Sequence, residues 1–312
     1  AEACQALAIS KNTLSQLERI NRLVPVAVGQ AIGAAPGAGR PKWTTLATAF
    51  EKEQLSEKRV LDVLGQSGVL DSDGRLDLVL KEIGGAGQQA LLAAKVAIVG
   101  AGGLGGPAGL YLAAAGVGTI GVIDDDVVEN ANLQRQVIHR DQDIGMPKVF
   151  SAEAAMRAQN PYVEVRPFHR RLTAEIAEDL FADFDLILDG TDNFETRYLV
   201  NATAVKLGKP LISGALSQWE GQLSLFHPKS GGPCYQCIFP EAPAPGLAPN
   251  CSEAGVVGPL PGVIGSMMAV EAIKELTGAG GGLRGKMFIY DAMFAETRVI
   301  RLKKRDGCET CG

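Results

Sequence analysis

Short apolar runs alternate with stretches of helical character from about residue 95 to residue 214. The run from Lys95 to Val99 leads into Gly100-Ala-Gly-Gly-Leu-Gly105. An alanine- and leucine-rich stretch follows, and a second apolar run from Thr119 ends in Asp124. Strand, glycine turn, helix, strand and acid in this order are typical of a nucleotide-binding βαβ unit.

Predicted strands and helices continue to alternate downstream, and from Gly221 onward the pattern changes to one of antiparallel strands. Further strands are expected over 163–167, 184–188 and 211–214, with helices over 151–158, 174–182 and 194–207. Such spacing predicts a parallel sheet with right-handed crossovers. From Gly221 onward, runs over 222–227, 286–291 and 297–302 indicate antiparallel strands that flank a helix from about 262 to 276. The pattern therefore predicts an α/β, Rossmann-like fold with one mixed, mainly parallel sheet.

The N-terminal part has a different, all-α pattern. A short helix from Ala3 to Ile9, the N-cap candidate Ser10 and a second helix from Thr13 to Leu23 suggest a helix-turn-helix. A further helical stretch ends at the turn Asp71-Ser-Asp-Gly74. We therefore expect a small helical piece over 1–70 and an α/β domain over 71–312.

Composition and charge narrow the class of protein. Of 312 residues, 46% are hydrophobic and 21% charged, as in globular domains. The net charge of -5 argues against general affinity for nucleic acid, although residues 1–60 hold 8 Lys and Arg against 5 Asp and Glu. Lys11, Asn12 and Arg19 could face DNA there, but a packing module with solvated charges is the favoured interpretation. No signal peptide and no transmembrane run are expected.

The glycine turn is the first candidate binding feature. Gly100 permits a tight turn, Gly102 lets the backbone approach a phosphate, and Gly105 lets the helix lie close to the strand. Asp124, at the end of the next strand, would hold a ribose hydroxyl. The alternative for Asp124 is an ordinary acid at a strand end.

Two basic residues and an acidic residue that follows another predicted strand belong to the same candidate nucleotide site. Arg135, in Asn132-Leu-Gln-Arg-Gln136, and Lys148, in Gly145-Met-Pro-Lys148, suit a triphosphate better than a dinucleotide. Asp192, in Asp189-Gly-Thr-Asp-Asn193, is a candidate ligand for the magnesium that accompanies ATP. Alternatively, Asp192 or Asn193 caps the helix that begins near residue 194.

Cysteines indicate a metal site and a reducing cytoplasm. Cys234-Tyr-Gln-Cys237 and Cys308-Glu-Thr-Cys311 provide four thiolates at zinc-site spacing. Two redox motifs are the less favoured alternative, because neither pair is expected to open a helix. Cys251 follows a proline- and glycine-rich loop, and we assign no role to Cys4. The three histidines form no metal or triad pattern in the sequence.

Several of these motifs, in order over about residues 82–312, resemble the MoeB/ThiF family of E1-like adenylyltransferases. They are GAGGLG, the DDD that begins at Asp124, NLQRQ, GMPK, DGTDN, CYQC, AGVVGPLPGVIGS and CETCG. The resemblance implies ATP-dependent, magnesium-assisted adenylylation of the C-terminal glycine of a ubiquitin-like, MoaD- or ThiS-like sulfur carrier in molybdopterin or thiamin biosynthesis. It also implies a cytoplasmic homodimer.

Family resemblance assigns roles to particular residues. The nucleotide-binding set would be Gly100, Gly102, Gly103, Gly105, Asp124, Asp126, Asn132, Arg135, Lys148, Asp192 and Asn193. The catalytic set would be Arg135, Lys148, Asp192 and Cys251, with Asp192 on magnesium. Cys251 would form a covalent link to the carrier, although an inert small residue is equally consistent with its position.

The chain departs from the family near residue 75. The family usually carries an arginine pair ahead of EIG, and those positions hold Asp73 and Leu76 here. Residues 1–50 resemble part of RepB-type plasmid partition proteins of the ParB group. A DNA-binding partition fragment joined to a weakly active or inactive E1-like domain is therefore the alternative function.

Overall fold

A computed structural model describes residues 83–244 and 255–312. The predicted N-terminal helices, the positions of Asp73 and Leu76, and Cys251 lie outside these residues, so the expectations about them stay predictions. The chain divides into two units, Ala1–Ala86 and Gly87–Gly312, and every strand of the described sheet lies in the second. The predicted domain boundary at residue 71 also stays a prediction.

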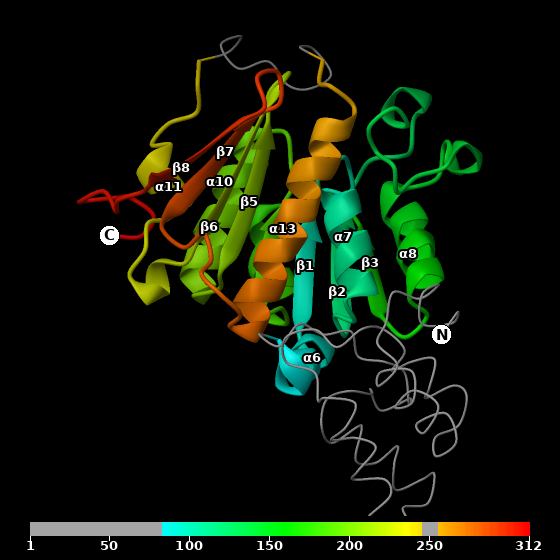
Figure 1. The fold of residues 1–312 in the computed structure, drawn as a ribbon, viewed down its shortest axis with the longest axis horizontal. Coiled ribbons are helices and arrows are strands. Elements are labelled where there is room, and N and C mark those ends of the chain that lie inside the picture. The colour runs from blue at the N-terminus through cyan, green and yellow to red at the C-terminus, as the bar shows by residue number, and fades with distance from the viewer. Residues whose placement is uncertain (1–82, 245–254) are drawn as a thin grey trace, which may run out of the picture. The chain divides into compact units, whose positions relative to one another are not determined.

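One eight-stranded sheet forms the centre of the second unit, in the order β3-β2-β1-β4-β5-β6-β7-β8 (Figure 1). The strands are β1 (Lys95–Val99), β2 (Thr119–Asp124), β3 (Glu164–His169), β4 (Leu186–Asp189), β5 (Leu211–Leu216), β6 (Glu220–Phe226), β7 (Lys286–Asp291) and β8 (Glu296–Arg301). The first five are parallel, and β5 to β8 pair antiparallel. This confirms the predicted mixed, mainly parallel sheet.

Helices cover both faces of the parallel part. The helices of the described residues are α6 (Gly84–Ala93), α7 (Gly105–Ala114), α8 (Lys148–Gln159), α9 (Ala174–Ala182), α10 (Phe194–Leu207), α11 (Tyr235–Ile238) and α13 (Pro259–Thr277). Short 3-10 turns occur at η1 (Asn130–Asn132), η2 (Asp141–Asp143) and η3 (Pro228–Ser230). In Figure 1, α7, α8 and α13 lie in front of the sheet and α10 lies behind it.

The packing explains why β1 is apolar along its whole length. Val96 and Ile98 belong to the core beneath α7, α8 and α13, whereas Ala97 and Val99 belong to the opposite core beneath α9 and α10. A strand buried on both faces needs apolar residues at successive positions rather than at alternate ones. The short continuous run in the sequence is the signature of this central position.

Most predicted elements are confirmed, with shifts at their ends. The helix over 194–207 and the strand over 286–291 have the predicted bounds. The helix expected from about residue 262 begins at Pro259, since proline at the first helical position costs no hydrogen bond. The expectation that neither CxxC pair opens a helix is wrong for the first pair, because Cys234 is the N-cap of the one-turn helix α11.

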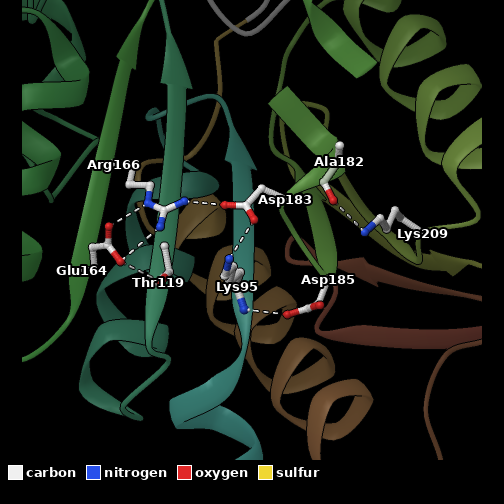
Figure 2. A network of polar contacts seen from close by, with 8 residues as sticks. All are labelled: Lys95, Thr119, Glu164, Arg166, Ala182, Asp183, Asp185 and Lys209. Carbon is white, nitrogen blue, oxygen red and sulfur yellow. Dashed lines mark hydrogen bonds and ion pairs between the residues drawn. The ribbon is translucent and has the colours of Figure 1, made fainter. Parts of the chain in front are cut away.

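Charged side chains gather at the amino ends of the parallel strands (Figure 2). Asp183 accepts a hydrogen bond from Lys95 Nζ at 2.7 Å and another from Arg166 Nη1 at 2.6 Å. Arg166 Nε in turn donates to Glu164 Oε1 at 2.8 Å. This network joins β1, β3 and the loop before β4. Within residues 83–244 and 255–312, no helix has both the length and the apolar character needed to span a bilayer.

Candidate functional site

A cavity of about 780 Å³ lies at the carboxyl ends of the parallel strands. Its lining includes the residues that end β1, β2 and β4 or directly follow them. The carboxyl edge collects the loops that precede the crossover helices, so open α/β sheets bind ligands there. The cavity therefore lies where the sequence pattern predicts a nucleotide.

The glycine turn forms one wall of the cavity. Gly100 has φ +93°, a left-handed conformation that favours glycine. A Cβ atom on Gly105 would lie 1.8 Å from the carbonyl oxygen of Gly100, so only glycine lets α7 begin this close to β1. Gly100, Gly102 and Gly103 line the cavity, whereas Gly105 is buried beside the turn.

Asp124 anchors the turn as well as facing the cavity. Its Oδ2 accepts a hydrogen bond from the Ala101 N–H at 2.7 Å, and its Oδ1 accepts one from the Asp126 N–H at 2.8 Å. Burial raises the pKa of Asp124, and the nearby Lys148 ammonium and the two backbone donors partly oppose this shift. Each carboxylate oxygen has a second lone pair, which leaves Asp124 able to accept a hydrogen bond from a hydroxyl group.

Both predicted cations line the same cavity. Lys148 is the first residue of α8, and its Nζ lies 2.7 Å from Asp126 Oδ2. The Lys148 side chain is only 8% exposed, whereas that of Asp126 is 68% exposed. Arg135 donates from Nη1 to the Ala131 carbonyl oxygen at 3.1 Å, which leaves its other donors for a ligand. An anion here would meet two positive charges and the glycine turn.

Asp192 and Asn193, in the loop after β4, were each predicted either to cap the next helix or to face a ligand, and the structure gives them different positions. Asn193 is the N-cap of α10, and its Oδ1 accepts a hydrogen bond from the Thr196 N–H at 2.9 Å. Asp192 is exposed and lines the cavity. The capping interpretation is therefore confirmed for Asn193, and Asp192 has the exposed carboxylate that a hard cation needs.

A buried ion pair between Arg197 and Asp189 holds the loop after β4 in place. Arg197, 7% exposed, donates from Nη2 to the carbonyl oxygens of Thr191 and Gly214 and lies 3.8 Å from Asp189 Oδ2. Asp189 also accepts a hydrogen bond from Ser213 Oγ at 2.9 Å. Arg197 was not predicted from the sequence; its signal was an arginine one turn into the helix that follows a buried acidic strand end.

Other residues of the cavity were not predicted, and the predicted residue Asn132 lies apart from it. The cavity-lining residues without a sequence-based assignment include Gln136, Arg170, Arg171 and Tyr235. They come from three separate segments, since only Arg170 and Arg171 are neighbours in the chain, so no local pattern joins them. Asn132 is 9% exposed and is not among the lining residues; its Oδ1 accepts a hydrogen bond from the Glu129 N–H, which closes the turn η1.

The four cysteines of the CxxC pairs converge, as predicted. The Sγ atoms lie 3.8 Å apart for Cys234 and Cys237, 3.6 Å for Cys234 and Cys308, and 3.5 Å for Cys237 and Cys311. A tetrahedral zinc ion with bonds of about 2.3 Å sets its sulfur ligands about 3.8 Å apart. Burial raises the pKa of the Cys234 and Cys311 thiols, whereas backbone donors from Cys311 and Thr310, against burial, lower the pKa of Cys308 to about 6. The cluster therefore fits a tetrahedral thiophilic metal.

Comparison with known proteins agrees with this geometry. Residues 75–310 match the ThiF family. A sulfur carrier protein adenylyltransferase from Thermus thermophilus is 47% identical over 239 residues, which is 75% of this chain and 88% of the relative. A SAMP-activating enzyme E1 from Haloferax volcanii is 46% identical over 235 residues, covering 75% of this chain and 86% of the relative.

Solved structures show the same fold. A crystal structure of E. coli MccB superposes with a TM-score of 0.65 at 21% identity, covering 86% of this chain and 85% of MccB. At this identity the likeness concerns the fold alone. The match to the family over residues 75–310 and the 46–47% identity over most of the length of these two relatives show that the chain belongs to the ThiF family.

Proposed function

We propose that this chain is an adenylyltransferase that uses ATP to adenylylate the C-terminal glycine of a ubiquitin-like sulfur carrier protein of molybdopterin or thiamin synthesis. The observation that carries the proposal is that one cavity is lined by the glycine turn, Asp124, Arg135, Lys148 and Asp192. The 47% identity to a sulfur carrier protein adenylyltransferase supports the choice of acceptor.

The residues of the cavity suit the parts of ATP. Asp124 would accept a hydrogen bond from a ribose hydroxyl, and the glycine turn would hold phosphate through backbone N–H groups at the start of α7. Arg135 and Lys148 would neutralise the phosphates, with phosphate competing against Asp126 for Lys148. Asp192 would ligate magnesium together with phosphate oxygens, since carboxylate and phosphate are its preferred ligands.

The reaction is a displacement at phosphorus. The glycine carboxylate attacks the α-phosphate of ATP, a new C(O)–O–P bond forms, and pyrophosphate leaves with the electron pair of the broken P–O bond. A carboxylate is a poor acyl donor, and AMP converts it into a good one. The chain's contribution would be to hold the two anions in line and to neutralise their charge, because positioning and electrostatic stabilisation dominate such chemistry.

The cysteine cluster is proposed as a structural zinc site with ligands Cys234, Cys237, Cys308 and Cys311. A closed set of four thiolates leaves no open coordination position, which is the arrangement of structural rather than catalytic zinc. The ion would tie residues 308–311, near the end of this sequence, to α11. Homodimerisation, a cytoplasmic location and a covalent role for Cys251 are further proposals that rest on the family alone.

ATP–pyrophosphate exchange with a MoaD- or ThiS-like carrier tests the proposal. We expect carrier-dependent exchange by the wild-type protein and a fall of about 100-fold in Asp192→Asn, which removes the charge that would hold magnesium. Asp179→Asn is the matched control, since Asp179 is an exposed carboxylate of α9 and does not line the cavity. Equal exchange in both variants contradicts the role of Asp192, and no carrier-dependent exchange in the wild type contradicts the proposed function.

A further inference from the structure

We propose that His139 is a positioning residue for the phosphate-binding turn, holding the Ala101–Gly102 peptide so that the Gly102 N–H faces the cavity. The inference rests on the proposed function in one respect, that ATP is the ligand of the cavity. His139 is 6% exposed and is not one of the cavity-lining residues, so it would act through the turn rather than by touching ATP.

The Ala101 backbone is held from two sides. Its carbonyl oxygen lies 3.0 Å from His139 Nε2, and its N–H donates to Asp124 Oδ2 at 2.7 Å. A carbonyl oxygen can only accept, so Nε2 carries the proton and donates it. One residue of the turn is thereby fixed by two side chains, one from β2 and one from the segment before α8.

The direction of the next N–H group follows from peptide geometry. In a trans peptide the C=O and the following N–H point in opposite directions. Because the Ala101 carbonyl points toward His139, the Gly102 N–H points away from it. Gly102 lines the cavity and His139 does not, which directs this N–H toward the ligand side. Backbone donors aimed in this way form anion-binding concavities.

The ring of His139 is itself held by the elements that flank Lys148. Nδ1 lies 2.8 Å from Ser151 Oγ in α8, and Ser151 Oγ lies 2.7 Å from Asp143 Oδ2 at the end of η2. Lys148 starts α8, less than one turn before Ser151. The helix that delivers the cation therefore also orients the imidazole behind the glycine turn.

This arrangement keeps the donor in place in both protonation states. Burial lowers the pKa of His139, with Lys148 acting in the same direction and Asp143 and the Ala101 carbonyl opposing it. Ser151 Oγ donates its one proton to Asp143 Oδ2 in the structure, so in the neutral ring the hydroxyl must turn from Asp143 to donate to Nδ1. In the imidazolium, Nδ1 donates to Ser151 Oγ and the hydroxyl turns to Asp143. Nε2 remains a donor to Ala101 in either state.

Two variants of His139 that differ by one methylene test the proposal. The amide nitrogen of glutamine reaches about as far as Nε2, whereas that of asparagine ends near the place of Nδ1. We expect His139→Asn to weaken binding of a non-hydrolysable ATP analogue with Mg²⁺ by about 10-fold, the equivalent of one well-placed hydrogen bond. His139→Gln should bind within about threefold of the wild type. Isothermal titration calorimetry on the full chain measures both, and carrier affinity should not change.

The controls separate positioning from folding. His227→Asn removes another poorly exposed histidine, one that does not line the cavity, and should lower the melting temperature without changing ATP affinity. Ser151→Ala, which removes the Nδ1 partner with little loss of volume, should weaken ATP binding about threefold and provides a readout if His139→Asn does not fold.

The outcomes distinguish this inference from the function on which it rests. Wild-type affinity for ATP in His139→Asn or, should that variant not fold, in Ser151→Ala overturns the inference alone. Wild-type protein that binds no ATP overturns the proposed function and the inference together. A loss in His139→Asn that His139→Gln restores supports the positioning role.

Discussion

At the scale of single residues, Gly105 determines how closely α7 can approach β1. We predict that Gly105→Ala lowers the free energy of unfolding by about 3 kcal/mol, because its Cβ would lie 1.8 Å from the Gly100 carbonyl oxygen and neither backbone can yield freely. Urea denaturation measures the effect. The Gly105→Ala substitution should also abolish ATP binding, since the displaced turn would no longer face the cavity.

Gly262→Ala is the matched control for this prediction. Gly262 lies inside α13, and a Cβ there would meet nothing within 4 Å. Alanine should therefore raise the free energy of unfolding by about 0.5 to 1 kcal/mol through its higher helix propensity. Similar effects of the two substitutions would contradict the close approach of α7 and β1.

At the scale of elements, the cysteine cluster connects α11 with residues 308–311. We predict that Cys308→Ser lowers the zinc content of purified protein from about one equivalent to well below half and lowers the melting temperature, since metal binding to a closed thiolate site contributes directly to folding. Metal analysis by mass spectrometry and calorimetry provide the two readouts.

Cys4→Ser is the control for the metal prediction, because Cys4 is not part of either CxxC pair. It should leave zinc content at the wild-type value. Zinc well below half an equivalent in the wild-type protein, or unchanged zinc in Cys308→Ser, would contradict the site. Because neither CxxC pair supplies more than two ligands, the cluster exists only when β6 to β8 bring the pairs together.

At the scale of the whole molecule, the two edges of the sheet have different charge environments. The carboxyl edge forms the cavity, whereas the amino edge carries the network of Figure 2. Hydrogen bonds from Arg166 lower the pKa of Glu164, and hydrogen bonds from Lys95 and then Arg166 lower the pKa of Asp183. A carboxylate with a lowered pKa in the folded state stabilises the fold above its unfolded pKa, and this contribution is lost as the pH falls through the folded pKa.

We therefore predict that Arg166→Met destabilises the protein at pH 7 and that the difference from the wild type shrinks toward zero below about pH 4, where unpaired carboxyl groups become protonated. Urea denaturation at pH 7 and pH 3 measures the difference. High salt should reduce this difference, because both carboxylates that Arg166 binds are exposed. Arg157→Met, which breaks the surface pair with Glu153, is the control and should show a smaller change with pH. A difference independent of pH would show that Arg166 acts by packing alone.

Local chemistry in the sequence determined the elements and the type of site. The apolar run of β1, the glycine turn, Asp124 at the end of β2 and the paired cysteines each depend on neighbours within a few residues, so their spacing is visible along the chain. For the same reason the sequence could state two alternatives for Asp192 and Asn193 but could not choose between them. Only the folded loop shows one side chain capping α10 and the other facing the cavity.

Tertiary structure decided the contacts between segments that are distant in the sequence. His139 meets Ala101 across 38 positions, Lys148 meets Asp126 across 22, and Arg197 meets Gly214 across 17. Such pairs depend on the strand order β3-β2-β1-β4-β5 and on which face each helix covers. Periodicity and turn residues leave both open, because they report on local backbone geometry rather than on which segments become neighbours.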